Sequence, residues 1–179
     1  MTAQQLQDFL HRCIPATAAL HIRVVSCGAD GVALLMPHAP NRNHKNTVFG
    51  GSTALGATVC GWALVHLNCP EAAGNIVIQS SKIRYTAPAH GDLLLSVRSP
   101  DAAEWAHCRE MLARRGKGKI NLAVSGFSDG VLGGAICDFG SLKIQNGNPI
   151  KRISALLQSP NAKRRCKIIT AAFFYAQAF

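Results

Sequence analysis

The chain has 179 residues, 48% of them hydrophobic, which fits one globular domain with its own core, and we expect no second full domain. The formal net charge of +10 suggests a nucleic-acid or membrane partner, but six of the nineteen basic residues and none of the nine acidic residues lie beyond Gln145, which leaves +4 for residues 1–145. Because the basic residues of this main part are not interleaved with aromatic residues, we expect no nucleic-acid binding.

The seven cysteines are an odd number and contain no C-x-x-C pair, so we expect reduced, buried thiols in a cytoplasmic protein. The N-terminal residues 1–10 are polar and begin an amphipathic pattern, which is not that of a signal or transit peptide. The uncharged run Phe49–Pro70 approaches the length of a membrane span. Its polar residues Ser52, His66 and Asn68, and its many small residues, favour a buried core helix instead.

The first predicted elements are a short amphipathic helix and a hairpin. Apolar residues recur at helical spacing over residues 3–14, and Pro15 ends the pattern. Residues 21–27 are rich in β-branched side chains and are followed by a Gly-Ala-Asp-Gly turn and by residues 32–36, which predicts two antiparallel strands.

The next stretch combines a polar loop with the start of the apolar helix. Residues 41–52 read NRNHKNTVFGGS, and the two glycines would let backbone approach a ligand. The free N–H groups and the dipole of a helix beginning there favour developing negative charge. Since no Asp or Glu occurs between Gly31 and Pro70, this pattern predicts an oxyanion site without a carboxylate base nearby in the sequence.

The second half of the chain predicts four strands in a meander. Residues 75–86 give the longest strand pattern, and a Pro-Ala-His-Gly turn leads into a strand at 92–97. Residues 104–115 indicate a short helix or an irregular connection, and strands at 117–127 and 131–144 flank a Ser-Asp-Gly turn at 128–130. This order favours an α+β domain over residues 1–145, with an antiparallel sheet curled around one central helix.

Residues 146–179 differ in composition, because basic clusters precede an apolar and aromatic end. They fit a mobile tail, a membrane-surface helix or sequence that is not part of the fold. We favour a poorly packed tail outside the core, and we leave membrane contact through it as an alternative.

Several of these motifs resemble the hotdog-fold thioesterase superfamily, and within it the putative thioesterase family typified by the C-terminal domain of YiiD. The resembling residues span about 5–145 and are the Asn-x-Asn and TVFGGS of the loop, the Gly-Trp pair at 61–62, the KIRY stretch at 82–85 with Pro88 and Gly91-Asp92, and Arg114-Arg115-Gly116.

The resemblance implies a hotdog fold, a homodimer or dimer of dimers with active sites at the subunit interface, and acyl thioesters of coenzyme A or acyl carrier protein as substrates. It implies that the loop asparagine and the Gly51 backbone bind the thioester carbonyl. Where many hotdog hydrolases carry Asp or Glu in the central helix, this chain has Thr58. Some members resemble malonyl carrier-protein decarboxylases, which supply acetyl groups to fatty-acid synthesis.

Elementary chemistry points the same way. Hydrolysis needs a group that activates water, whereas loss of CO2 from a malonyl thioester needs an enolate-stabilising site and a dry place for the carboxylate. The predicted catalytic residues are Asn43, Gly51, Ser52 and Thr58, and the predicted substrate-binding residues are Asn41, Phe49, Gly50, Lys82, Arg84 and Arg115. We expect no metal and no cofactor.

Each of these residues also has a structural interpretation. Asn43 could cap a turn, Asn41 could be structural, and the Thr58 hydroxyl could bond back to its helix. The basic residues Lys82, Arg84 and Arg115 form either a rim for phosphates or an acidic carrier protein, or only the solvated faces of strands. The alternative function is therefore a binding module that recognises an acyl thioester without catalysis.

Overall fold

The computed structural model describes residues 1–128, 136–137 and 141–145. The helices within them are α1 Ala3–Cys13, α2 Pro15–Ala19, α3 His38–Asn41, α4 Gly50–Asn68, the 3-10 helix η1 Pro70–Ala72, and α5 Ala102–Arg115. The strands are β1 Arg23–Cys27, β2 Gly31–Met36, β3 Ile76–Ile78, β4 Leu93–Arg98, β5 Lys117–Asn121, β6 Val124–Ser128, β7 Ile136–Cys137 and β8 Ser141–Gln145.

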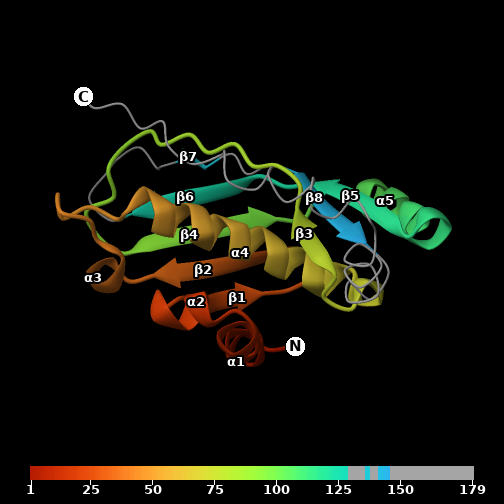
Figure 1. Cartoon of the computed structure of the whole chain (residues 1–179), viewed down its shortest axis with the longest axis horizontal. Helices are drawn as coiled ribbons and strands as arrows, with labels where there is room; N and C mark the ends of the chain where they lie inside the picture. Colours follow the sequence, from red (N-terminus) through yellow and green to blue (C-terminus); the bar gives the residue numbers. More distant parts are fainter. Residues whose placement is uncertain (129–135, 138–140, 146–179) are drawn as a thin grey trace, which may run out of the picture. The chain divides into compact units, whose positions relative to one another are not determined.

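The strands pair antiparallel in two sheets, one in the order β1-β2-β4-β6-β7 and the other in the order β3-β8-β5. Only Leu122 and Ala123 separate β5 from β6, so this stretch of chain passes from one sheet directly into the other. Figure 1 shows α4 lying along β2 and β4, with α3 at the N-terminal end of α4 and α5 at the opposite end of the domain. The predicted central helix is therefore confirmed.

The core forms where the inner face of the sheet meets α4. Alternate residues of β2 are buried, and their neighbours Ala33 and Leu35 are only half-buried on the outer face, as a strand with one covered side requires. Gly56 brings α4 close to the sheet, because a Cβ atom there would run into the Met36 sulfur and the Leu95 side chain. A small residue is needed at this contact.

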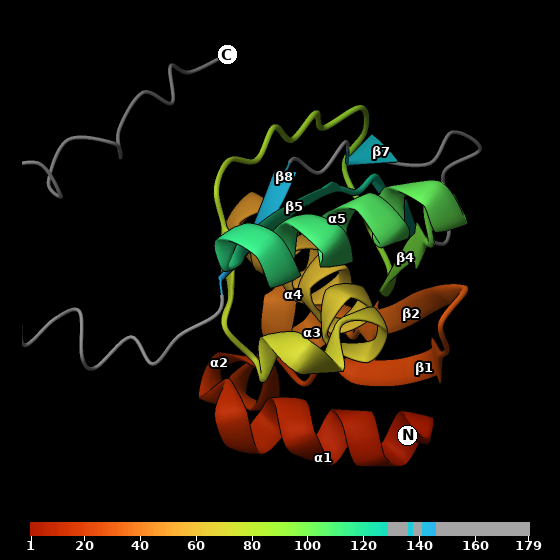
Figure 2. The same cartoon turned by 90° about the vertical axis from the view of Figure 1, so that its right-hand side faces the viewer.

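Helix α1 covers the β1 edge of the domain, as Figure 2 shows, and its contacts explain the amphipathic pattern. Leu6 and Leu10 are buried, and Thr2 with Gln5 forms a capping box at the start. Pro15 ends this helix as predicted, and it also begins α2, where the missing N–H is tolerated at the first position.

The helix at 102–115 resolves the alternative that the sequence left open. Trp105, Cys108 and Leu112 are buried at helical spacing, and α5 packs against β5. Gly118 of β5 makes the close packing possible, since a Cβ atom there would lie 2.6 Å from the Cys108 carbonyl oxygen.

Two expectations about the strands are wrong. The strand predicted over 75–86 is regular only in β3, and no strand pairing holds residues 79–92 in the part of the chain that is described. The strands do not follow a meander either, because β4 pairs with β2 and β6 while β3 pairs with β8. The alternation of side chains indicates an extended backbone, but it does not specify which strand lies beside it.

The last hairpin is confirmed by its register, since β6 pairs with β7 and β5 pairs with β8. Its predicted turn at 128–130 falls largely outside the described residues, and the predicted tail at 146–179 falls wholly outside them. Across the described ranges, none of the helices combines the length and the apolarity that crossing a membrane would require.

Candidate active site

The polar loop before α4 is shaped by the side chain of Asn43. Its Oδ1 accepts from the backbone N–H groups of Lys45 at 2.8 Å and Thr47 at 3.2 Å, and its Nδ2 donates to the Thr47 hydroxyl at 3.0 Å. This is the turn-capping arrangement that asparagine often adopts. It uses one of the two amide hydrogens, and within the described residues the second has no acceptor. The predicted catalytic role of Asn43 remains a prediction.

Asn41 connects the loop to the preceding part of the chain. Its Nδ2 donates to the carbonyl oxygens of Leu20 at 2.9 Å and Pro37 at 2.8 Å, and its own carbonyl accepts from Phe49 N–H at 2.7 Å. The side chain is buried, and its Oδ1 has no hydrogen-bond partner in the part of the chain described. These contacts favour the structural interpretation, and a direct role in substrate binding remains a prediction.

The N-terminus of α4 carries free hydrogen-bond donors. Phe49 is the N-cap residue, and no side chain caps the helix. The first N–H group with a partner is that of Thr53, which donates to Phe49 O at 3.0 Å. Among the residues described, the preceding N–H groups of Gly50, Gly51 and Ser52 have no acceptor. Together with the helix dipole, these groups favour an anion or an oxyanion.

A cavity of about 400 Å³ opens beside this first turn. One side of the cavity is formed by the loop and α4, and the other side is formed by residues 85–89 and the start of β4. The lining residues are Val48, Gly50, Thr53, Tyr85, Thr86, Ala87, Pro88, Ala89 and Leu93. The lining is mostly apolar, and none of these residues carries a charge. The cavity can therefore hold an uncharged chain next to free N–H donors.

Two aromatic rings lie against the two glycines at the start of α4. The Tyr85 hydroxyl donates to Gly50 O at 2.8 Å, and a Cβ atom on Gly50 would lie 3.3 Å from the ring. A Cβ atom on Gly51 would meet the ring of Phe49, which is itself more than half exposed. Sequence reasoning placed Phe49 and Gly50 at the site but not Tyr85. The only signal for Tyr85 was its place in the KIRY stretch.

Thr58 lies two turns further along α4 and is half-buried. Its hydroxyl has no hydrogen bond in the described part of the chain, whereas the hydroxyl of Thr53 does bond back to the helix, at Phe49 O. Helical spacing puts Thr58 on the same side of α4 as Ala54 and Trp62, which are also half-buried. Thr58 is therefore near the site but does not line the cavity.

The predicted basic residues are not brought together. Lys82 and Arg84 are exposed on the segment that leads to the cavity wall. Arg115 is the last residue of α5, and Figure 1 shows that helix at the end of the domain opposite α3 and the start of α4. Within one chain, Arg115 does not reach the loop.

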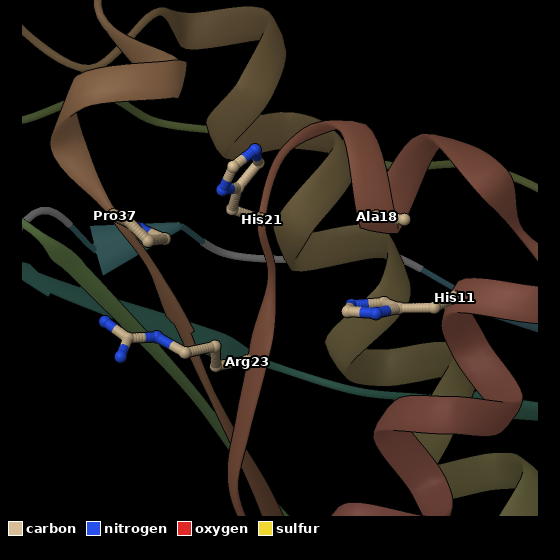
Figure 3. A pocket seen from close by; sticks show the side chains of 5 residues that line it. All are labelled: His11, Ala18, His21, Arg23 and Pro37. Atoms are coloured by element: carbon tan, nitrogen blue, oxygen red, sulfur yellow. The ribbon is translucent and has the colours of Figure 1, made fainter.

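A second hollow, of about 370 Å³, lies between α1, α2 and the strands and is lined by His11, Ala18, His21, Arg23 and Pro37. Figure 3 shows that His11 extends toward the hollow, while the side chain of Arg23 extends away from His11. His11 Nε2 is within 2.8 Å of Ile22 O and is thus engaged with the backbone. These side chains do not converge on a common point, so we do not interpret the hollow as a catalytic centre.

Groups with shifted pKa values occur outside the cavity lining. Burial raises the pKa of the Cys60 thiol and lowers the pKa of His66. A hydrogen bond between the thiols of Cys69 and Cys108 raises the pKa of Cys69 and lowers that of Cys108. The described cavity lining itself contains no carboxylate, imidazole or thiol that could act as a base or nucleophile.

Comparison with known proteins identifies relatives of the whole domain. The sequence model of the family described as "Putative thioesterase (yiiD_Cterm)" matches residues 3–140. A solved structure of a protein of unknown function from Chlorobaculum tepidum is 26% identical, with a TM-score of 0.74, over 81% of this chain and 94% of that chain. A putative thioesterase from Shewanella oneidensis is 29% identical, with a TM-score of 0.65, over 81% and 97% of the two chains.

A third structure, of a probable thioesterase from Pseudomonas aeruginosa, is 19% identical, with a TM-score of 0.68, over 82% of this chain and 97% of that chain. At that identity the match supports the fold alone. The family match and the likeness to these structures confirm the predicted α+β hotdog fold, with an antiparallel sheet around a long central helix.

Proposed function

The chain belongs to the putative thioesterase family typified by the C-terminal domain of YiiD, and on that premise we propose that it is an enzyme that decarboxylates a malonyl thioester. The product would be an acetyl thioester, which can start fatty-acid synthesis. The observation that carries the proposal is an uncapped helix N-terminus beside a mostly apolar cavity whose described lining contains no carboxylate.

The proposed step is balanced without any further reactant except a proton. The bond between the carboxylate carbon and the α-carbon breaks, CO2 leaves, and the electron pair moves to the thioester carbonyl to give an enolate. The N–H groups of Gly51 and Ser52, with the second amide hydrogen of Asn43, would stabilise the enolate oxygen. The α-carbon then takes a proton from solvent to give the acetyl thioester.

The apolar wall supports this chemistry for a second reason. A carboxylate is poorly solvated in a cavity lined by groups such as Val48, Ala87 and Leu93, whereas CO2 is uncharged. The ground state is therefore destabilised relative to the transition state. Hydrolysis, by contrast, would need a base to activate water, and Thr58, at the position where many hotdog hydrolases carry a carboxylate, cannot act as one at neutral pH.

The charge around the cavity favours an anionic carrier of the acyl group. Between Gly31 and Gly91 the only acidic residue is Glu71, which lies in η1 at the far end of α4. Four basic side chains are exposed here, namely Arg42 and Lys45 in the loop before α4 and Lys82 and Arg84 in the stretch after β3. Their charge suits the phosphates of coenzyme A or the acidic surface of an acyl carrier protein.

We further propose a homodimer in which residues 79–84 pair with a second copy of the chain. These residues continue β3 without a neighbouring strand among the described residues, and Val77 of β3 is more than half exposed. A free backbone edge of this kind pairs readily with another chain. The half-buried face of α4 that carries Thr58 would also be covered by a partner.

Product analysis tests the reaction. Purified protein is incubated with malonyl and acetyl thioesters of coenzyme A and of acyl carrier protein, and the products are identified by mass. Acetyl thioester formed from the malonyl substrate supports the proposal. Release of free acid and thiol would mean a hydrolase instead, and binding without turnover would mean a binding module.

The mass in solution tests the dimer. Ser81→Pro removes one backbone N–H donor from residues 79–84, and Ser81→Ala is the matched control that keeps this donor. We expect a dimer for the wild type and for Ser81→Ala, and a shift toward monomer for Ser81→Pro. A monomeric wild type, or a Ser81→Pro dimer as tight as the control, would contradict pairing through this segment.

A further inference from the structure

Tyr85 connects the chain after β3 to the first turn of the central helix. Its hydroxyl donates to the Gly50 carbonyl oxygen at 2.8 Å. The ring lies so close to Gly50 that a Cβ atom there would be 3.3 Å from the ring and 3.4 Å from the hydroxyl oxygen. The absence of a side chain at Gly50 therefore leaves room for the Tyr85 ring, and the hydrogen bond requires a ring that carries a hydroxyl at position 85.

A second connection lies four residues further along. The backbone N–H of Val48 donates to the Ala89 carbonyl oxygen at 2.8 Å. The two hydrogen bonds tie residues 85 and 89 to residues 50 and 48, and the stretch 85–89 forms one wall of the cavity beside α4. Both bonds therefore contribute to the distance between this wall and the first turn of α4.

The wall has little regular structure to hold it in place. Residues 79–92 take part in no strand pairing within the described chain. The side chains of Ala87, Pro88 and Ala89 in this wall are small and apolar. The Tyr85 hydroxyl is a polar side-chain group that bonds the wall to α4. Loss of a neutral hydrogen bond of this kind changes an equilibrium by roughly 2- to 12-fold.

We propose that Tyr85 is a positioning and specificity-determining residue that holds the cavity wall against α4 and thereby limits the length of the acyl chain. The inference rests on the proposed function in one respect, namely that the cavity receives the acyl group. The hydroxyl fixes the position of the wall, and the ring occupies space that a longer chain would need. Removing the hydroxyl and removing the ring therefore have different effects.

Two variants separate these effects. Tyr85→Phe keeps the ring and loses the bond to Gly50, so we expect KM for the malonyl thioester to rise about 3- to 10-fold, as for one lost neutral hydrogen bond, while kcat stays within about twofold. Tyr85→Ala also removes the ring, so thioesters with six- to eight-carbon chains should gain at least about tenfold relative to two-carbon chains. Chains that are not turned over are compared as competitive inhibitors.

Hydrogen exchange supplies a readout that needs no substrate. In Tyr85→Phe the amides of residues 85–87 and 89 should exchange at least about threefold faster than in the wild type, because the local opening becomes less costly, while those of β2 and β4 stay unchanged. Ser80→Ala is the matched control, since Ser80 is exposed on the same segment and does not line the cavity. It should change neither the exchange nor the chain-length preference.

The two readouts separate the possible failures. Unchanged exchange in Tyr85→Phe, with normal turnover, overturns the positioning role and leaves the proposed function standing. Faster exchange without any change of chain-length preference in Tyr85→Ala overturns the role in specificity. A wild type that neither turns over nor binds any thioester overturns the proposed function, and the specificity role with it.

Discussion

The rings of Trp62 and His66 stack one helical turn apart on α4, with 5.0 Å between their centroids and 13° between their planes. The Phe9 ring of α1 joins the same stack, with its centroid 4.7 Å from that of His66. The imidazole thus lies between the first helix and the central helix, where burial lowers its pKa. Protonation of His66 and the packing of α1 on α4 therefore oppose each other.

The first prediction follows from the sign of this shift. As the pH falls, the unfolded chain takes up a proton at His66 near the ordinary pKa of 6.5, while the folded chain resists it. The contribution of His66 to stability is therefore complete above pH 6.5 and decreases as the pH falls through the lowered pKa. Unfolding free energies of the wild type should drop more between pH 8 and pH 5 than those of His66→Phe, which keeps a stacked ring without a charge. Equal drops would show that His66 is not the group responsible.

The second prediction concerns the contact between α4 and the sheet. Gly56→Ala would place a methyl group against the Met36 sulfur and the Leu95 side chain, and overpacking of this kind costs about 1 to 3 kcal/mol. The gain in helix propensity on replacing glycine with alanine is only about 0.5 to 1 kcal/mol. The strain wins, so we expect a lower free energy of unfolding in a denaturant titration.

A double mutant tests whether the contact with Met36 is the cause. Met36→Ala alone should destabilise by roughly 2 to 5 kcal/mol because it leaves a cavity. In the double mutant the new methyl group partly fills that cavity, so the two costs should not add, and the coupling should be about 0.5 to 3 kcal/mol. Additive costs would place the strain of Gly56→Ala elsewhere.

The third prediction concerns residues 146–179. Strand β8 ends at Gln145 and pairs with both β3 and β5, so a chain of residues 1–145 keeps every strand that the structure describes. We expect this truncated chain to retain the oligomeric state and the activity of the full chain. Unfolding or a smaller assembly on truncation would show that the boundary is wrong. Sedimentation with anionic lipid vesicles tests membrane contact separately, and equal sedimentation of both chains would eliminate it.

The parts of the fold that the sequence predicted are those fixed by local chemistry. The central helix was predictable because its residues are uncharged over its whole length and Gly50-Gly51 begins it after a polar loop. The first hairpin was predictable because a short glycine turn joins two strands of matching pattern. In both cases the residues that determine the element are neighbours in the chain.

The strand order was not predictable for the same reason. Alternation over 75–86 indicates an extended chain, but within the described residues the only strand beside it is β8, about seventy residues later in the sequence, and this pairing ends at Ile78. Likewise, β4 lies between β2 and β6, and no short-range signal distinguishes that order from a meander. Pairing partners are set by packing on α4, which a single sequence does not display.

The candidate site was predictable in its position and less so in its members. The loop and the start of α4 do lie beside a cavity, but the opposite wall comes from residues 85–89, which were assigned to a strand and a turn. Tyr85 therefore escaped notice as a site residue. The Asn43 side chain shapes the loop, and among the described residues one of its amide hydrogens has no acceptor, so its predicted catalytic role has still to be separated from its loop contacts.

The fourth prediction separates the loop-shaping role of Asn43 from its proposed role as an amide donor to the enolate. Asn43→Asp keeps an oxygen that can accept from the N–H groups of Lys45 and Thr47, but it loses the amide donor, whereas Asn43→Ala loses both. If the amide hydrogen stabilises the enolate, both variants should lower kcat on a malonyl thioester by about a hundredfold or more, since such a donor acts mainly in the transition state. Thr58→Ala should cost far less, because decarboxylation needs no base at that position.

Thermal unfolding provides the control for this comparison. Asn43→Ala should unfold at a lower temperature than the wild type, because the loop loses its cap, and Asn43→Asp should stay close to the wild type. Lost activity in a normally stable Asn43→Asp then cannot be attributed to a disordered loop. Full activity in Asn43→Asp would mean that Asn43 only shapes the loop, so that the enolate is held by the Gly51 and Ser52 N–H groups alone. Loss of activity in Thr58→Ala, with Asn43→Ala active, would instead favour a threonine-assisted hydrolysis.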